Sequence, residues 1–322
     1  MKRMILILAV AVLALGCLTA CAGNDADNGK IKIVTTIFPE YDWVMNILGD
    51  NPGGAEVTML LDSGVDLHSF QPTAEDILKI SSCDLFIYVG GESDAWVEDA
   101  LRNAQNKNRV VINLLEVLGD KVKEEEVVEG MQGEDEEEEE EEEPEYDEHV
   151  WLSLKNASIL TSAIGEKLSA IDPDNKSVYA NNLFKYKQKL EELDGSYKAA
   201  VDAASVKTLL FGDRFPFRYL TDDYDLSYYA AFVGCSAETE ASFETIAFLS
   251  KKVDECALHA VMTIEGTNHR IAETIVQNTA TKDQKILALD SMQSVTATDV
   301  KNGVTYLGIM EKNLEVLKEA LK

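Results

Sequence analysis

Two histidines follow predicted strands, where ligand-binding loops collect in α/β proteins. His68 lies in the segment Asp66–Thr73 (DLHSFQPT), and His149 lies in Asp147–Ser153 (DEHVWLS). Asp290 ends an apolar predicted strand much farther along the chain. Imidazole nitrogens and carboxylate oxygens are common ligands of zinc and manganese. We therefore expect His68, His149 and Asp290 to bind one divalent transition metal ion.

The other histidines and the cysteines give weaker signals. His259 enters a predicted strand and His269 precedes a predicted helix, so neither is expected to bind metal. Beyond the N-terminal region the cysteines are Cys83, Cys235 and Cys256, and no CxxC pair occurs among them. A redox role or a thiolate–zinc role is therefore not expected. A disulfide between Cys235 and Cys256 stays open, because spacing alone does not decide it.

Strands and helices alternate along the chain and must position these side chains. Apolar, β-rich runs predict strands in the first half at residues 31–36, 56–61, 84–89 and 109–114. The same pattern predicts strands in the second half at residues 207–211, 227–233, 260–264 and 285–289. Helical patterns separate these runs, which indicates parallel sheets covered on both faces. The predicted fold is α/β with two lobes, each a mainly parallel sheet flanked by helices, and a ligand cleft between them.

A long helical pattern connects the two halves. It begins at Asp172 and Pro173, a typical N-cap and first-turn pair, and continues to about Ala204. About 30 residues would extend roughly 45 Å, which is longer than one lobe is wide. It is either a long core helix or a rigid spanning helix that joins the lobes, and its length favours the second. The expected organisation is a signal peptide at 1–21, a tether at 22–30, an N-terminal lobe at 31–171, the connecting helix at 172–204 and a C-terminal lobe at 205–322.

The charge is strongly negative and mostly local. The sequence has 29 Lys and Arg against 58 Asp and Glu, a net charge of −29, which argues against nucleic-acid binding. Glu124–Glu148 holds 17 of these acidic residues and no Lys or Arg. Such a stretch predicts a solvated, disordered loop over 121–148. It either has no specific role or collects divalent cations near the cleft through many weak carboxylate contacts.

The N-terminus has the features of an export signal. Two cations precede the apolar run Met4–Leu15, which is too short for a comfortable membrane span. Leu18–Cys21 resembles the bacterial lipobox, in which the cysteine is lipidated, and Cys17 ends a weaker second candidate. The alternative is a soluble secreted protein. We expect an extracytoplasmic monomer anchored to the cell membrane through a lipid on Cys21.

Several segments resemble one known family, the metal-binding (zinc/manganese, cluster A-I) solute-binding lipoproteins of bacterial ABC importers. Val34–Pro39 is similar to its opening strand, and Asp66–Thr73 and Asp147–Leu154 are similar to its two histidine motifs. Leu289–Met292 is similar to the segment that carries its last aspartate ligand. The resemblance covers nearly the whole mature chain. It implies two α/β lobes with a long spanning helix and a metal ion held between the lobes.

The resemblance also implies a function. The protein would capture Zn²⁺, or else Mn²⁺, with His68, His149 and Asp290 and deliver it to an ABC permease, without enzymatic activity. One alternative is a metal-dependent hydrolase that uses the same ligands with Glu265 as general base, although neither an HExxH motif nor a paired-metal spacing occurs. Another is an adhesin or a binder of an organic solute on the same frame.

One departure from the family pattern concerns the third ligand. The family has a His or Glu just before an aromatic-rich helix, whereas this chain has Arg214, and a guanidinium group has no lone pair for a metal. Asp213 could provide an oxygen ligand instead. Otherwise Arg214 pairs with Glu265 outside the ligand sphere, or a water molecule fills the position. An oxygen ligand would make the site less selective for zinc.

Overall fold

The computed structural model describes residues 30–51, 53–102, 104–132, 145–236, 240–266 and 268–322. The predicted signal peptide, the lipobox with Cys21 and the acidic run Glu134–Glu143 lie outside these ranges. In the described part of the chain, no helix combines the length and the apolar character that a membrane span requires.

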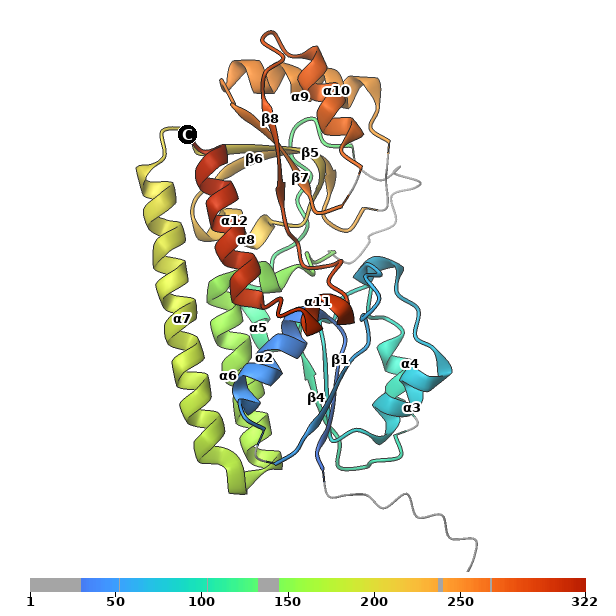
Figure 1. Cartoon of the computed structure of the whole chain (residues 1–322). Helices are drawn as coiled ribbons and strands as arrows, with labels where there is room; N and C mark the ends of the chain where they lie inside the picture. The colour runs from blue at the N-terminus through green and yellow to red at the C-terminus, as the bar shows by residue number, and fades with distance from the viewer. Residues whose placement is uncertain (1–29, 52, 103, 133–144, 237–239, 267) are drawn as a thin grey trace, which may run out of the picture. The chain divides into compact units, whose positions relative to one another are not determined.

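The first sheet contains strands that all run parallel, in the order β2-β1-β3-β4. The strands are β1 (Lys32–Thr35), β2 (Glu56–Met59), β3 (Leu85–Tyr88) and β4 (Val110–Asn113). The helices of this half are α2 (Phe38–Leu48), α3 (Ala74–Ser82), α4 (Val97–Arg102), α5 (Leu114–Leu118) and α6 (Leu154–Ile171). Helix α3 packs against α4, whereas α2 and α5 pack against α6 (Figure 1). Thr73 caps α3 in a reciprocal arrangement with Asp76, as the sequence indicates.

The second sheet is also parallel and has the order β6-β5-β7-β8. Its strands are β5 (Thr208–Phe215), β6 (Ser227–Val233), β7 (Ala260–Ile264) and β8 (Lys285–Leu289). The helices are α8 (Arg218–Asp223), α9 (Phe243–Glu255), α10 (Arg270–Asn278), α11 (Ala297–Lys301) and α12 (Tyr306–Ala320). The two parallel sheets with flanking helices confirm the predicted fold class.

Strand β5 differs from its prediction. It continues past Phe211 to Phe215, with a shift of register against β6 between Phe211 and Arg214. Asp213 and Arg214 therefore belong to the strand, and helix α8 begins only at Arg218. The strand signal in the sequence stops at Phe211 because Gly212, Asp213 and Arg214 carry no apolar alternation, whereas in the structure Arg214 and Phe215 pair with β6 again after the register shift.

The long helix α7 (Lys176–Ala203) joins the lobes and packs along α2, α6 and α12 (Figure 1). Its 28 residues extend about 42 Å. Tyr186 and Tyr197 are buried on its inner face, and the hydroxyl group of Tyr197 donates to the Met310 carbonyl at 2.6 Å. This confirms the predicted spanning helix.

The segment after β8 returns to the first half of the chain and contacts it. Ser63 pairs with Thr296, which lies just before α11, and Tyr306 at the start of α12 is fully buried. The Tyr306 ring lies 5.3 Å from the Trp43 ring of α2, and its hydroxyl group donates to the Trp151 carbonyl at 2.7 Å. The lobe boundaries at 171 and 205 stay predictions, because the chain after β8 contacts the first half again.

The described ends of the acidic segment contact the second lobe, which the sequence does not indicate. Glu126 accepts hydrogen bonds from Arg218 and, at 3.0 Å, from Tyr228, both on the second lobe. Glu129 lies 3.5 Å from Lys252, and Gln132 forms a bridge with Phe232 of β6. The cations and hydroxyl groups of the second lobe offset the local negative charge, and sequence neighbours alone do not reveal such partners.

Two buried carboxyl groups stabilise the turn after β1 and the loop after β3. Glu40 is fully buried, and its Oε2 accepts from the Thr36 amide at 2.8 Å and the Ile37 amide at 3.3 Å. Burial, followed by the charge of Asp94, raises the pKa of Glu40 to about 8. Asp94 accepts from the Gly90 amide at 3.0 Å, and burial raises its pKa to about 7.

We predict that Glu40→Gln weakens the pH dependence of stability. The pKa of a glutamate is about 4.3 in an unfolded chain, so between that pH and about 8 the folded protein binds more protons than the unfolded one. The free energy of unfolding of the wild type should therefore fall as the pH rises through this window. The fall should exceed that of Glu40→Gln by about 2–4 kcal/mol between pH 5 and 9, measured by denaturant titration. The exposed Glu56→Gln should behave as the wild type, and equal slopes for Glu40→Gln and wild type would contradict the prediction.

Candidate functional site

His68 lies in a short 3₁₀ turn, Leu67–Ser69, that follows β2. The turn forms because the Asp66 side chain accepts a hydrogen bond from the His68 amide at 3.0 Å. The side chain of His68 is 12% exposed, and its Nδ1 lies 2.7 Å from the Ser93 hydroxyl group. This contact occupies Nδ1 and leaves Nε2 pointing away from it.

His149 is fully buried and precedes a second 3₁₀ turn, Val150–Leu152. Asp147 holds it twice, because its Oδ1 accepts from the His149 amide at 2.8 Å and lies 3.1 Å from Nδ1 of the ring. A carboxylate at this position fixes the ring orientation and makes the other nitrogen a better metal ligand.

The two free nitrogens meet. Nε2 of His68 lies 3.2 Å from Nε2 of His149, although the residues are 81 positions apart. A tetrahedral zinc ion with bonds of about 2.0–2.1 Å separates two ligand nitrogens by about 3.3 Å. The spacing of the imidazoles is therefore that of two ligands on one ion.

The charges around the pair favour a neutral His68. Burial, and then the neighbouring His149, lower the pKa of His68 to about 3, so that its lone pair is available at neutral pH. Burial would lower the pKa of His149 too, but the Asp147 carboxylate raises it above its ordinary value. Asp147 thus offsets the cost of placing positive charge at this buried position.

A thiol completes the cluster. Among the described residues, the group whose donor atoms all lie within 4.8 Å of one another consists of His68, His149 and Cys235. Cys83, Cys235 and Cys256 are all free thiols, so the structure has no Cys235–Cys256 disulfide. A thiolate–zinc role is not expected from the sequence, yet the Cys235 sulfur lies close to both histidines. The position of Cys235 just after the end of β6 could have indicated this, because parallel strands end at the same edge as the other site loops.

Asp290 and Asp213 are not part of this group of donor atoms. Asp290 Oδ1 accepts from the Met292 amide at 2.8 Å, in the turn after β8. Asp213 uses both oxygens, accepting from the Arg214 amide at 2.9 Å and the Ile264 amide at 3.3 Å. The predicted ligand set is therefore assembled only in its two histidines, and the two aspartates stay predictions.

Arg214 forms an ion pair with Asp66 and not with Glu265. Burial would raise the pKa of Asp66, but the guanidinium group holds it below its usual value. Glu265 instead accepts from the Ser291 amide at 2.7 Å and the Gln293 amide at 3.2 Å, and so shapes the loop that carries Asp290. The sequence alone missed the Asp66–Arg214 contact because it joins different lobes.

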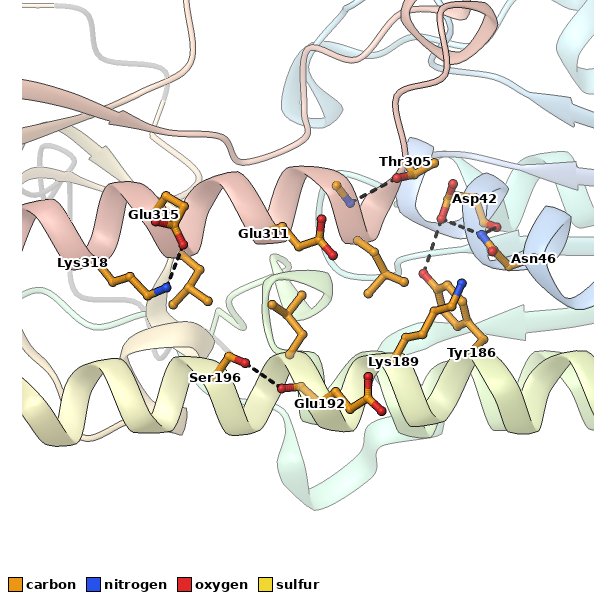
Figure 2. Close-up of a pocket in the computed structure, with 14 residues that line it drawn as sticks. Asp42, Asn46, Tyr186, Lys189, Glu192, Ser196, Thr305, Glu311, Glu315 and Lys318 are labelled. Carbon is orange, nitrogen blue, oxygen red and sulfur yellow. Dashed lines mark hydrogen bonds and ion pairs between the residues drawn. The ribbon is translucent and has the colours of Figure 1, made fainter.

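A cavity of about 710 Å³ lies between α7 and α12, and the histidines are not among its lining residues (Figure 2). Its lining carries charges of both signs. Two of the lining residues, Lys318 and Glu315, form an ion pair of 2.7 Å within α12. Asp42 accepts from Asn46 at 2.9 Å and from Tyr186 at 3.4 Å, and burial raises its pKa to about 6. The cavity is a partly polar groove between helices, and no histidine or cysteine lines it.

Comparison with known proteins identifies the family. The family model described as zinc-uptake complex component A, periplasmic (ZnuA) matches residues 33–320. The chain belongs to the ZnuA family. A zinc-binding lipoprotein AdcA of Streptococcus pneumoniae is 31% identical over 306 residues, which cover 94% of this chain and 58% of that protein. The chain thus spans somewhat more than half the length of this ZnuA-family relative.

Two further matches cover nearly the whole of the chains compared. The high-affinity zinc uptake system protein ZnuA of Bacillus subtilis is 29% identical over 314 residues, 94% of each chain. The crystal structure of the Zn(II)-bound ZnuA-like domain of S. pneumoniae AdcA has a TM-score of 0.71 and 30% identity, and the match covers 91% of this chain and 99% of that one. The recognised family resemblance is thus confirmed.

We predict that Asp147→Asn weakens metal binding without removing a donor atom. Asparagine can still accept from the His149 amide, but it removes the negative charge beside Nδ1. The affinity for Zn²⁺ should fall about 10- to 100-fold, measured by competition with a chromophoric chelator. The control is Asp120→Asn, at an exposed aspartate just before the acidic segment, which should leave the Zn²⁺ affinity unchanged. If Asp147→Asn binds Zn²⁺ with unchanged affinity, Asp147 does not support His149 in metal binding.

Proposed function

We propose that the protein captures Zn²⁺ outside the cytoplasmic membrane and delivers it to an ABC permease. His68 and His149 bind the ion through Nε2. The observation that carries this proposal is the 3.2 Å separation of two Nε2 atoms whose rings are each held at Nδ1 by another group. The names of the ZnuA-family relatives support zinc as the cargo.

Asp290 is proposed as an oxygen ligand that joins after the loop behind β8 adjusts. Burial and then the nearby Glu265 raise the pKa of Asp290 to about 6, which marks a place where negative charge is poorly compensated. A divalent cation would supply this compensation. Asp213 is the weaker candidate, since both of its oxygens already accept main-chain hydrogen bonds. With two imidazoles in the site, zinc is favoured over manganese.

Transport fits the site better than the two alternatives. A hydrolase needs a free general base beside an open metal position, whereas the Glu265 carboxylate is occupied by the Ser291 and Gln293 amides. An adhesin or an organic-solute binder needs no convergence of buried imidazoles. The protein is therefore proposed to be a carrier and not an enzyme.

Delivery is proposed to need small loop movements. Helix α7 packs along both α2 and α12, and Tyr306 locks α12 against Trp43, so wide opening of the lobes would break buried contacts. The protein would act as a monomer, held at the membrane by a lipid on Cys21, with both lobes facing the permease.

We predict that His68→Ala and His149→Ala each abolish function. Removal of one of two nitrogen ligands should lower Zn²⁺ affinity by about 100-fold or more, measured by calorimetric titration of demetallated protein. Zinc-limited growth of cells that depend on this importer should fail with either variant. The exposed His259→Ala is the control, and circular dichroism checks the folding of all three. Tight, stoichiometric Zn²⁺ binding by folded His68→Ala would refute the assignment.

The lipid anchor is tested separately. Cys21→Ala should move the protein from the membrane fraction to the soluble extracytoplasmic fraction or the medium, because no thiol remains at the predicted cleavage site. Cys17→Ala, at the weaker candidate, is the matched control and should stay membrane-bound. Fractionation and mass spectrometry of the N-terminus give the result. If Cys21→Ala stays in the membrane fraction as Cys17→Ala does, Cys21 is not the anchor.

A further inference from the structure

We infer that the thiolate of Cys235 is a third ligand of the metal ion, beside His68 and His149. This inference rests on the proposed function and adds a residue that no sequence motif indicated. The starting point is the cluster geometry, in which the Cys235 sulfur and one nitrogen of each histidine lie within 4.8 Å of one another. Zinc bonds of about 2.3 Å to sulfur and 2.0–2.1 Å to nitrogen need only small adjustments from there.

The backbone before Cys235 is shaped for this close approach. Gly234 follows directly after β6, and a Cβ atom on it would lie 3.1 Å from Cε1 of His149 and 3.0 Å from the Phe215 carbonyl oxygen. A side chain at Gly234 would therefore need the loop or the His149 ring to shift by a few tenths of an ångström. The glycine brings Cys235 next to the two rings.

The acidic segment holds the same loop from the other side. The Cys235 amide donates to Oε1 of Glu125 at 3.1 Å. Two main-chain hydrogen bonds tie this segment to the His149 loop: Glu125 N to Glu145 O, and Asp147 N to Lys123 O, both 2.9 Å. One connected piece of chain thus positions both Cys235 and His149, which is how ligand loops are usually supported.

Arg214 leaves the third position to the thiol. Its guanidinium group cannot ligate, and it is engaged with Asp66. On binding, the S–H bond of Cys235 breaks, a Zn–S bond forms with the sulfur lone pair, and the proton passes to solvent; no electron is transferred. Two imidazoles and one thiolate form a soft donor set, which selects Zn²⁺ over Mn²⁺.

The test uses Co²⁺ as a spectroscopic probe in the mature protein after demetallation. A thiolate ligand gives an intense sulfur-to-cobalt charge-transfer band in the near ultraviolet, which imidazole and carboxylate ligands do not give. The wild type and Cys256→Ser, the control at the other half-buried thiol, should show the band, whereas Cys235→Ser should lose it. The Zn²⁺ affinity of Cys235→Ser should fall about 100-fold.

A second variant separates loss of a ligand from loss of structure. Cys235→His supplies a nitrogen donor in place of sulfur, so it should recover much of the Zn²⁺ affinity without the charge-transfer band. Tight metal binding by wild type and Cys235→Ser alike, with no band in either, would overturn the role of Cys235 and leave His68 and His149 in place. Failure of the wild type to bind Zn²⁺ or Co²⁺ at all would instead refute the proposed function.

Discussion

The metal centre depends on two imidazole rings that face each other through their Nε2 atoms in a buried space. Such an arrangement is stable only if both Nδ1 atoms have partners, since an unpaired buried nitrogen costs free energy. The Ser93 hydroxyl group lies 2.7 Å from Nδ1 of His68, and Oδ1 of Asp147 lies 3.1 Å from Nδ1 of His149. Glu148 adds a second support, because its Oε1 accepts from the Ser93 amide at 2.8 Å. The loop after β2, the loop after β3 and the residues just before the turn Val150–Leu152 therefore act together on one pair of nitrogens.

A permanent cation beside a metal site needs compensation, and Asp66 provides it for Arg214. The pair joins the loop after β2 to strand β5, so it also links the two lobes next to the histidines. Asp66 has two tasks, since its other oxygen accepts from the His68 amide at 3.0 Å. Arg214 therefore makes a contact between the lobes beside the histidines.

The sequence predicted elements well where the signal was local. Strands β6 and β7 match their apolar runs residue for residue, and His68 was found because it follows the predicted strand at 56–61. His149 follows the acidic segment, and it was found through Asp147–Leu154, which resembles the family's second histidine motif. The prediction failed where long-range contacts decide. Strand β5 continues to Phe215 because Arg214 and Phe215 pair with β6, and Cys235 was dismissed because it forms no CxxC pair. A single residue that joins such a cluster from the end of a strand has no spacing signal in the sequence.

The acidic segment contacts the cluster of two histidines and Cys235 at both of its described ends. It leaves the first lobe before Glu125, which holds the Cys235 loop, and it returns through Asp147, which holds His149. The two ends are also joined to each other by main-chain hydrogen bonds of 2.9 Å. A displacement of either end would alter the position of a histidine or a cysteine, because these contacts are direct. The segment therefore has a structural role at its ends, whatever its central glutamates do.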